Sequence, residues 1–155
     1  MDKVKILMIG AGNIANTHLD SYSRNDEVEI AAICDINESR LNETADIFGI
    51  EKRFTSVDEM LKSVKGDAAD VCVWNCSHAE CSIAALNAGL HVLCEKPMAY
   101  NTEQAIAMRD AAVKNNKILM IGFVRRFLNI TKIVKDFIDV GTLGDIYYTK
   151  ATCTR

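Results

Sequence analysis

The stretch KILMIGAGNIA, residues 5–15, decides the fold of this chain. It joins a short apolar run to a G-x-G-x-x-A turn, and the turn opens a segment of helical character. Gly10 permits a tight turn, Gly12 lets a ligand approach the backbone, and the small Ala15 lets the helix pack closely on the strand. The first backbone N–H groups of the helix, at Asn13 and Ile14, suit a pyrophosphate. The stretch therefore predicts a dinucleotide-binding turn.

The rest of the chain continues this alternation of apolar runs and helical segments, which predicts βαβ units and a parallel sheet. The expected strands are 5–9, 28–34, 53–54, 71–75, 91–94 and 118–121. The expected helices are 13–22, 38–48, 56–63, 79–88 and 102–114, with Ser56 and Thr102 as N-terminal caps. The predicted fold class is α/β, a Rossmann dinucleotide-binding fold with a parallel sheet.

The pattern changes after Ile121. GFVRRF leads into an expected helix over 127–139, the turn VGTLGD follows, and residues 146–153 alternate as a lone strand does. A lone strand leaves its backbone groups unpaired, which indicates a partner sheet elsewhere. We expect a Rossmann NAD(P)-binding domain at 1–122, a connecting helix and turn at 123–144, and at 145–155 the first strand of a missing C-terminal domain. The fold would then be truncated at the start of a second, α+β domain for substrate binding and oligomerisation.

An acidic residue completes the dinucleotide fingerprint. Asp35 ends the run EIAAICD and follows Ala15 at the spacing of roughly 20 residues that the motif requires. Its carboxylate can accept the ribose hydroxyls of an adenosine, and it would repel a 2′-phosphate by about 1 to 4 kcal/mol. NAD is therefore the expected cofactor. Arg40 nearby leaves NADP as the alternative.

Two other readings of these residues stay open at this point. The glycines could simply form a tight turn beside a solvated Asp35. A methyltransferase also combines a glycine turn with a later acidic residue, although an acidic residue usually precedes its glycines. Here the apolar Leu7, Met8 and Ile9 precede Gly10, which disfavours that class.

Composition excludes several classes of partner. The charged fraction is 25% and the formal net charge is −3, with no basic block that could follow a nucleic-acid backbone. No apolar run approaches the roughly 20 residues of a membrane span, and the N-terminus leads directly into a strand rather than a signal peptide. We expect a cytoplasmic protein that binds neither nucleic acid nor membrane.

The cysteines suggest neither disulfides nor a metal. The chain has six, at positions 34, 72, 76, 81, 94 and 153, without a C-x-x-C pair. Most lie in apolar runs, so we interpret them as reduced core residues. A zinc site built from Cys72, Cys76 and Cys81 is the alternative, but their spacing lacks the usual paired pattern. We expect no bound metal.

The richest group of residues is Glu95-Lys96-Pro97, directly after the expected fifth strand. Ligands of an open parallel sheet bind outside the carboxyl ends of its strands. If the backbone stayed extended, Glu95 and Lys96 would point to opposite faces, so Lys96 could reach the nicotinamide pocket while Glu95 holds the loop. A solvated lysine is the alternative. Pro97 would shape the turn, and a cis bond before it is one option.

Together, GAGNIA, Asp35, AALNAGLHVLCEKPMA and GFVRRF resemble the glucose-fructose oxidoreductase, inositol dehydrogenase and rhizopine-catabolism (Gfo/Idh/MocA) family over essentially the whole chain. The resemblance implies a Rossmann domain that binds NAD or NADP, followed by an open-faced antiparallel-sheet domain that holds a sugar or polyol and builds a homo-oligomer. It implies that Lys96 lies beside nicotinamide and substrate, orients the substrate hydroxyl and assists proton transfer. An aspartate and a histidine of the second domain would complete the catalytic site.

The resemblance also assigns binding roles. It favours Arg125 over Arg126 as a substrate-binding residue, with two solvated arginines as the alternative. The expected cofactor-binding set is Gly10, Gly12, Asn13, Ile14, Asp35, Asn75, Cys76, Ser77, Glu95 and Lys96.

The segment after the fourth strand departs from the family pattern. Relatives often read Thr-Pro-Asn-x-x-His where this chain reads Cys76-Ser77-His78-Ala79-Glu80-Cys81. Backbone contacts from 75–77 can survive that change, whereas a side-chain role at position 81 cannot. We expect His78 to be a loop or cap residue, and His18 and His91 to be structural.

The predicted function is that of an NAD(P)-dependent oxidoreductase. It would transfer hydride between a sugar, polyol or related alcohol and the nicotinamide, with this chain as the cofactor-binding half and inactive alone. The alternative is a non-catalytic dinucleotide-binding module or sensor.

Overall fold

The computed structural model describes residues 3–152. Its strands are β1 (Val4–Ile9), β2 (Val28–Cys34), β3 (Arg53–Phe54), β4 (Ala68–Val71), β5 (His91–Cys94) and β6 (Leu119–Ile121). Its α-helices are α1 (Asn13–Tyr22), α2 (Glu38–Phe48), α3 (Val57–Ser63), α4 (His78–Asn87), α5 (Thr102–Lys114) and α6 (Asn129–Asp139). Two short 3₁₀ helices, η1 (Asn75–Ser77) and η2 (Val124–Phe127), complete the elements.

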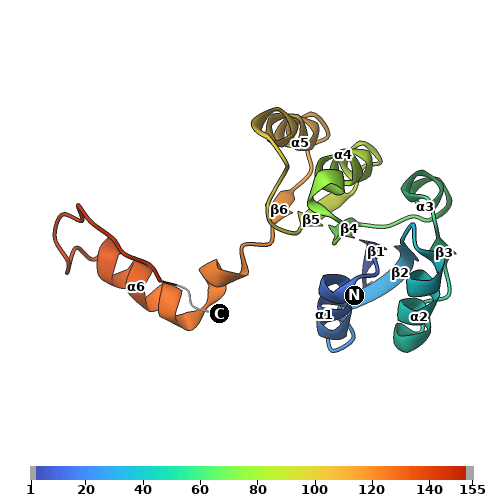
Figure 1. The fold of residues 1–155 in the computed structure, drawn as a ribbon, viewed down its shortest axis with the longest axis horizontal. Helices are drawn as coiled ribbons and strands as arrows, with labels where there is room; N and C mark the ends of the chain where they lie inside the picture. The colour runs from blue at the N-terminus through green and yellow to red at the C-terminus, as the bar shows by residue number, and fades with distance from the viewer. Residues whose placement is uncertain (1–2, 153–155) are drawn as a thin grey trace. The chain divides into compact units, whose positions relative to one another are not determined.

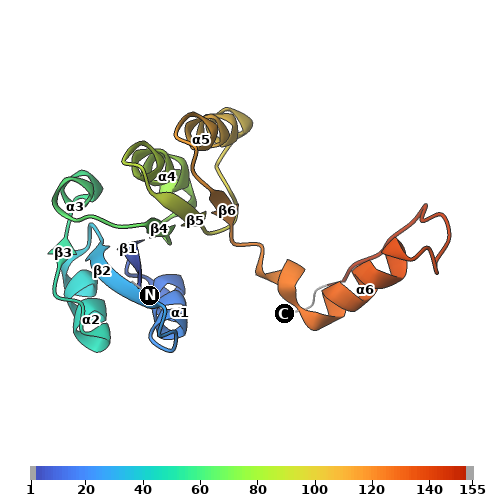
Figure 2. The same ribbon diagram turned by 180° about the vertical axis from the view of Figure 1, so that it is seen from behind.

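The strands form one six-stranded sheet in the order β3-β2-β1-β4-β5-β6, with every neighbouring pair parallel. Helices α1 and α2 cover one face of this sheet, and α3, α4 and α5 cover the other (Figures 1 and 2). The strand order reverses direction between β1 and β4, which is the switch point where such sheets bind ligands. The predicted Rossmann fold is confirmed.

The core consists of two apolar clusters, one on each face of the sheet. Leu7 and Ile9 of β1 belong to the cluster under α3, α4 and α5, whereas Met8 between them joins the cluster with Leu19 of α1. This division follows from the strand period of two residues, which sends successive side chains to opposite faces. Each such side chain is at most 1% exposed, and its burial contributes roughly 1.5 to 3 kcal/mol.

Short polar side chains begin three of the helices. Asn37 accepts a hydrogen bond from Arg40 N at 3.0 Å, and Ser56 accepts one from Glu59 N at 3.4 Å. The cap of α5 is Asn101, which accepts from Gln104 N at 2.9 Å. The predicted cap at Thr102 is therefore one residue too late, since Asn and Thr are both good caps and only the backbone conformation distinguishes them.

The fourth strand lies earlier in the sequence than expected. It was predicted at 71–75, whereas β4 runs over Ala68–Val71. Its register explains the difference, because Val71 pairs with Ile9 and with Cys94, the last residues of both neighbouring strands. Beyond Val71 the chain leaves the sheet and turns into η1, although its side chains remain apolar.

The chain divides into two compact units, one ending at Gly122 and the next beginning at Phe123. In the second unit, α6 is amphipathic, with exposed Ile130, Ile133, Val134 and Phe137 on the spacing of one helix face. The assignment of 123–144 as a connector and 145–155 as the start of another domain stays a prediction.

The strand expected at 146–153 is not formed by its described residues, 146–152. Residues 146–152 have no regular secondary structure, and position 153 lies outside the described residues. A strand is defined by its hydrogen bonds to a neighbouring strand. The alternating pattern of residues 146–152 therefore produces no strand where no neighbouring strand pairs with it. Between residues 3 and 152, no helix is both long and apolar enough to cross a membrane.

Candidate functional site

The register of the sheet aligns the first residues beyond its strands in one row. The last residues of β1, β2, β4 and β5 are paired with one another across the sheet: Ile9, Cys34, Val71 and Cys94. The residues that follow them, Gly10, Asp35, Cys72 and Glu95, therefore lie side by side at the carboxyl edge of the sheet. Candidate residues separated by up to 85 positions in the chain thus share one site.

The glycine turn has the geometry that its sequence predicts. Gly10 has a φ of 108°, and a Cβ on it would meet the backbone oxygen of Cys72 at 2.3 Å. Its N–H donates to Cys34 O at 2.7 Å, which ties the turn to β2. A Cβ on Gly12 would meet no protein atom within 4 Å, because the space beside it is an open cavity that Gly12 lines.

Asp35 is the anchor of this turn. The residue is 8% exposed, and its Oδ2 accepts from Ala11 N at 2.8 Å. Its Oδ1 accepts from Asn37 N at 2.8 Å and from Arg40 Nη2 at 3.0 Å. Burial alone would raise the pKa of Asp35, but the hydrogen bonds from Arg40, Asn37 and Ala11 outweigh it and hold that pKa below its ordinary value.

A carboxylate offers about four acceptor positions, and three of those of Asp35 are used. One position is left for a ribose hydroxyl.

The glycine turn, Asp35 and the segments after β4 and β5 enclose a cavity of about 460 Å³. That volume falls within the usual range for small-molecule sites. From the expected set it is lined by Gly12, Asn13, Ile14, Asp35, Asn75, Ser77, Glu95 and Lys96. Gly10 lies behind it as the turn residue, and Cys76 is exposed beside Ser77 rather than in the lining. The structure thus brings most of the expected residues together.

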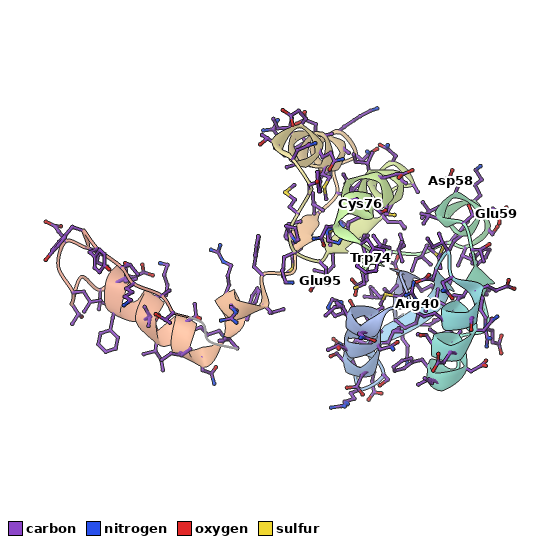
Figure 3. All side chains as sticks on the ribbon, in the orientation of Figure 1. Arg40, Asp58, Glu59, Trp74, Cys76 and Glu95 are labelled. Carbon is purple, nitrogen blue, oxygen red and sulfur yellow. The ribbon has the colours of Figure 1, made fainter. Side chains whose placement is uncertain are left out.

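The cavity also has an apolar border that sequence reasoning missed. Ile36 is 85% exposed and Trp74 is 75% exposed, and both line the cavity together with the half-exposed Ile14. Figure 3 labels Trp74, Arg40 and Glu95 around this edge of the sheet. Exposed apolar side chains in a concave site suit a flat ring. The signal available in the sequence was the chain's one tryptophan, directly before the loop of a candidate site.

Glu95 and Lys96 both line the cavity, with Glu95 buried and Lys96 exposed. The expectation of opposite faces does not apply, because β5 ends at Cys94 and the chain is no longer extended as a strand. Glu95 Oε2 accepts from Lys96 N at 3.1 Å. The peptide bond between Lys96 and Pro97 is cis.

His78 connects two loops of the site. It is the first residue of α4 and is 1% exposed. A residue near the helix start was expected, but its burial was not. Its Nδ1 lies 2.7 Å from Pro97 O and its Nε2 lies 3.1 Å from Val73 O. The ring therefore bridges the segment after β4 and the segment after β5. Only the fold reveals this role, because Pro97 is 19 residues away.

Arg125 belongs to the second unit, where its backbone oxygen accepts from Thr131 Oγ1 at 2.7 Å. Its role toward a substrate stays a prediction, as does that of Lys96.

The described cysteines are free thiols, as expected, and position 153 lies outside the described residues. Burial raises the pKa of Cys34 to about 12 and the pKa values of Cys81 and Cys94 to about 11. These thiols therefore stay neutral near pH 7. Across residues 3–152, the one group of potential metal ligands that comes together is His18, Asp70 and Cys72, not the three cysteines of the zinc alternative.

The fold, the glycine turn and the buried acidic residue define a dinucleotide-binding Rossmann domain. Residues 4–123 match the GFO_IDH_MocA family, an oxidoreductase family with an NAD-binding Rossmann fold. The chain belongs to this family, which confirms the resemblance found in the sequence.

Two curated relatives illustrate the range of this family. D-glucoside 3-dehydrogenase of Escherichia coli is 37% identical over 153 residues, covering 98% of this chain and 44% of that protein. Myo-inositol 2-dehydrogenase of Thermotoga maritima is 33% identical over 149 residues, covering 96% of this chain and 45% of that protein. The chain thus spans less than half the length of these relatives.

Solved structures show the same fold. The WlbA dehydrogenase of Chromobacterium violaceum, in complex with NADH and UDP-GlcNAcA, superposes with a TM-score of 0.92 at 28% identity over 95% of this chain and 43% of that one. The scyllo-inositol dehydrogenase of Lactobacillus casei, with bound NAD(H) and scyllo-inositol, has a TM-score of 0.87 at 25% identity over 93% of this chain and 43% of that one.

Proposed function

We propose that this chain binds NAD(H) in the cavity at the carboxyl edge of its sheet and is the cofactor half of a cytoplasmic sugar or polyol dehydrogenase. The observation that carries the proposal is the buried carboxylate of Asp35, hydrogen-bonded to the glycine turn and still able to accept from a ribose. The NADH and NAD(H) complexes of the structural relatives support the same cofactor.

Each part of the cavity suits one part of the dinucleotide. The first N–H groups of α1, at Asn13 and Ile14, and the bare backbone of Gly12 would hold the pyrophosphate. Asp35 would hold the adenosine ribose, with Ile36 beside the adenine. That orientation places the nicotinamide toward Lys96 and Glu95, which lie at the end of β5.

The cofactor supplies hydride chemistry at its nicotinamide, and the protein supplies placement. The exposed ammonium group of Lys96 would hold the substrate hydroxyl by its oxygen and assist the departure of its proton. An aspartate and a histidine of a further domain would complete the acid and base chemistry. Arg125 would contact an anionic or strongly polar part of the substrate, and the further domain would build a homo-oligomer.

The charge at Asp35 favours NAD over NADP. A 2′-phosphate would lie against a carboxylate whose pKa is already lowered, so it would meet a negative charge at neutral pH. Arg40 pairs with Asp35 at 3.0 Å and is therefore committed to that carboxylate rather than to a phosphate.

Fluorescence titration of the 155-residue chain tests the proposal. Trp74 lines the cavity, and tryptophan emission overlaps the absorption of reduced nicotinamide. We expect NADH to bind more tightly than NADPH, NAD⁺ to displace NADH more readily than NADP⁺ does, and Asp35→Asn to reduce both preferences. The matched control is Asp46→Asn, which removes an exposed carboxylate from α2. Failure of a correctly folded chain to bind any dinucleotide would refute the proposal.

A further inference from the structure

A buried polar cluster lies behind the cavity, between β4 and α1. At its centre is Asp70, 1% exposed, whose Oδ2 accepts from Tyr22 Oη and lies near His18 Nδ1, both at 2.7 Å. Cys72 Sγ lies 3.4 Å from Asp70 Oδ1. On the opposite side of its ring, His18 Nε2 lies 3.5 Å from Glu95 Oε1. The imidazole thus lies between two carboxylates.

Strand geometry explains why this cluster forms. Asp70 and Cys72 are two residues apart on one chain, so both side chains point to the sheet face that α1 covers. Cys72 follows the register pair of Val71 and Cys94, which places Glu95 beside it. Helix α1 then presents His18 and Tyr22, one turn apart, to the same surface.

The distances in this cluster are those of hydrogen bonds rather than of a metal site. The 2.7 Å between His18 Nδ1 and Asp70 Oδ2 is a normal hydrogen-bond length. Two ligands about 2.0 to 2.2 Å from one tetrahedral zinc ion would be separated by more than about 3 Å.

The charges of the cluster favour a protonated His18. Two carboxylates this deeply placed need a compensating cation, and the imidazolium can donate one N–H to each. The hydrogen bond to Asp70 raises the pKa of His18 above its ordinary value, against the opposing effect of burial. Burial also raises the pKa values of Tyr22 and Cys72, the other titratable groups that face the ring, so both stay neutral.

Glu95 connects His18 to the end of the cavity where we propose that the nicotinamide binds. Its Oε2 accepts from Lys96 N at 3.1 Å. On another side it lies against Gly122, where a Cβ would come within 2.7 Å of Oε1. The carboxylate is therefore held by the histidine, by the Lys96 backbone and by close packing against Gly122, directly after β6.

We propose that His18 is a positioning residue of the dinucleotide site, whose imidazolium links Asp70 to Glu95 and through Glu95 orients the backbone at Lys96. The inference rests on the proposed function, because it assumes that the nicotinamide binds at this end of the cavity. His18 acts on the ligand through Glu95 and contributes positive charge behind the nicotinamide pocket.

This arrangement predicts a selective effect on the two redox forms. NAD⁺ carries a positive nicotinamide ring and NADH a neutral one, so a nearby imidazolium disfavours NAD⁺ relative to NADH. When His18 loses its proton, the affinity ratio should move toward NAD⁺ by about three- to tenfold, as expected for the loss of one largely screened elementary charge. ADP-ribose lacks the ring and keeps the pyrophosphate, so its affinity measures the effect of the same charge on the pyrophosphate, which cancels in the ratio of NAD⁺ to NADH.

The experiment measures NAD⁺, NADH and ADP-ribose affinities of the 155-residue chain from pH 6 to 9 by calorimetry. The wild type should shift its ratio toward NAD⁺ as the pH rises, and His18→Asn should show the NAD⁺-shifted ratio throughout. The matched control is Tyr22→Phe, which removes a different hydrogen bond to Asp70 and should keep the wild-type pH response. An unchanged ratio in His18→Asn would overturn the proposal.

Nuclear magnetic resonance of the wild-type chain provides a second test that needs no variant. Because linkage is reciprocal, the ring nitrogens of His18 should titrate at higher pH in the NADH complex than in the NAD⁺ complex. Equal titration in both complexes would overturn the positioning role while dinucleotide binding stands. Absence of binding by all three ligands would instead refute the proposed function itself, and the positioning role with it.

Discussion

Substitution of the two glycines in the turn by alanine should separate folding from binding. Gly10→Ala places a residue with a side chain at a φ of 108°, which costs about 1 to 3 kcal/mol in backbone strain. The new Cβ would also lie 2.3 Å from Cys72 O, a backbone atom directly after β4 that can yield only if the sheet edge moves. We expect a total loss of about 3 to 5 kcal/mol in the free energy of unfolding.

Gly12→Ala is the matched control, because its φ of −80° suits any residue and the added Cβ meets no protein atom within 4 Å. Its free energy of unfolding should stay within about 1 kcal/mol of the wild type. The methyl group enters the cavity where the pyrophosphate would lie, so NADH affinity should fall at least about tenfold, or 1.4 kcal/mol.

Urea unfolding followed by circular dichroism measures both effects on stability, with the slope against denaturant expected to stay constant. Titration with NADH then measures binding by the folded variant. A Gly10→Ala chain as stable as the wild type would refute the close approach of this turn to β4. Undiminished NADH affinity in Gly12→Ala would refute the placement of the pyrophosphate.

Three further outcomes are expected. The pKa of Asp35 is lowered in the folded chain. Its contribution to stability is therefore present above its ordinary pKa and is lost as the pH falls through the folded value. Asp35→Asn should reduce this loss of stability at acid pH, measured by urea unfolding. The pKa of His18 is raised in the folded chain. Its contribution to the free energy of unfolding is therefore full below the ordinary histidine pKa of 6.5 and is lost as the pH rises through the folded value. The stability of His18→Asn should lack this decline at higher pH. In the dehydrogenase that we propose, Lys96→Met should abolish most turnover and retain NAD binding, whereas Lys62→Met on the exposed face of α3 should change neither. Normal turnover in Lys96→Met would contradict the proposed catalytic role of Lys96.

The glycine turn and Asp35 could be predicted because their roles depend on local rules. A turn with a positive φ needs glycine at one position, and the acidic residue follows at a spacing set by one helix and one strand. Both rules act over about 25 residues, so the sequence pattern contains them in full. The same holds for most helix and strand bounds.

The end of β4 and the lack of a strand at 146–152 could not be predicted, because strands depend on partners. Val71 is the last residue of β4 since its neighbours Ile9 and Cys94 end there, and the apolar run beyond it gives no sign of this. The alternating pattern at 146–152 is compatible with a strand, but no partner strand pairs with it among the described residues.

The sequence by itself determined the Rossmann class of this protein, the position of its glycine turn and the acidic residue beside it, because each follows from short-range steric and hydrogen-bonding requirements. Only the tertiary structure decided that Asp70 and His18, 52 residues apart, meet beneath Glu95. It alone placed His78 between two loops and Trp74 at the cavity. Such contacts arise from strand register and helix packing, which join distant segments that no local pattern connects.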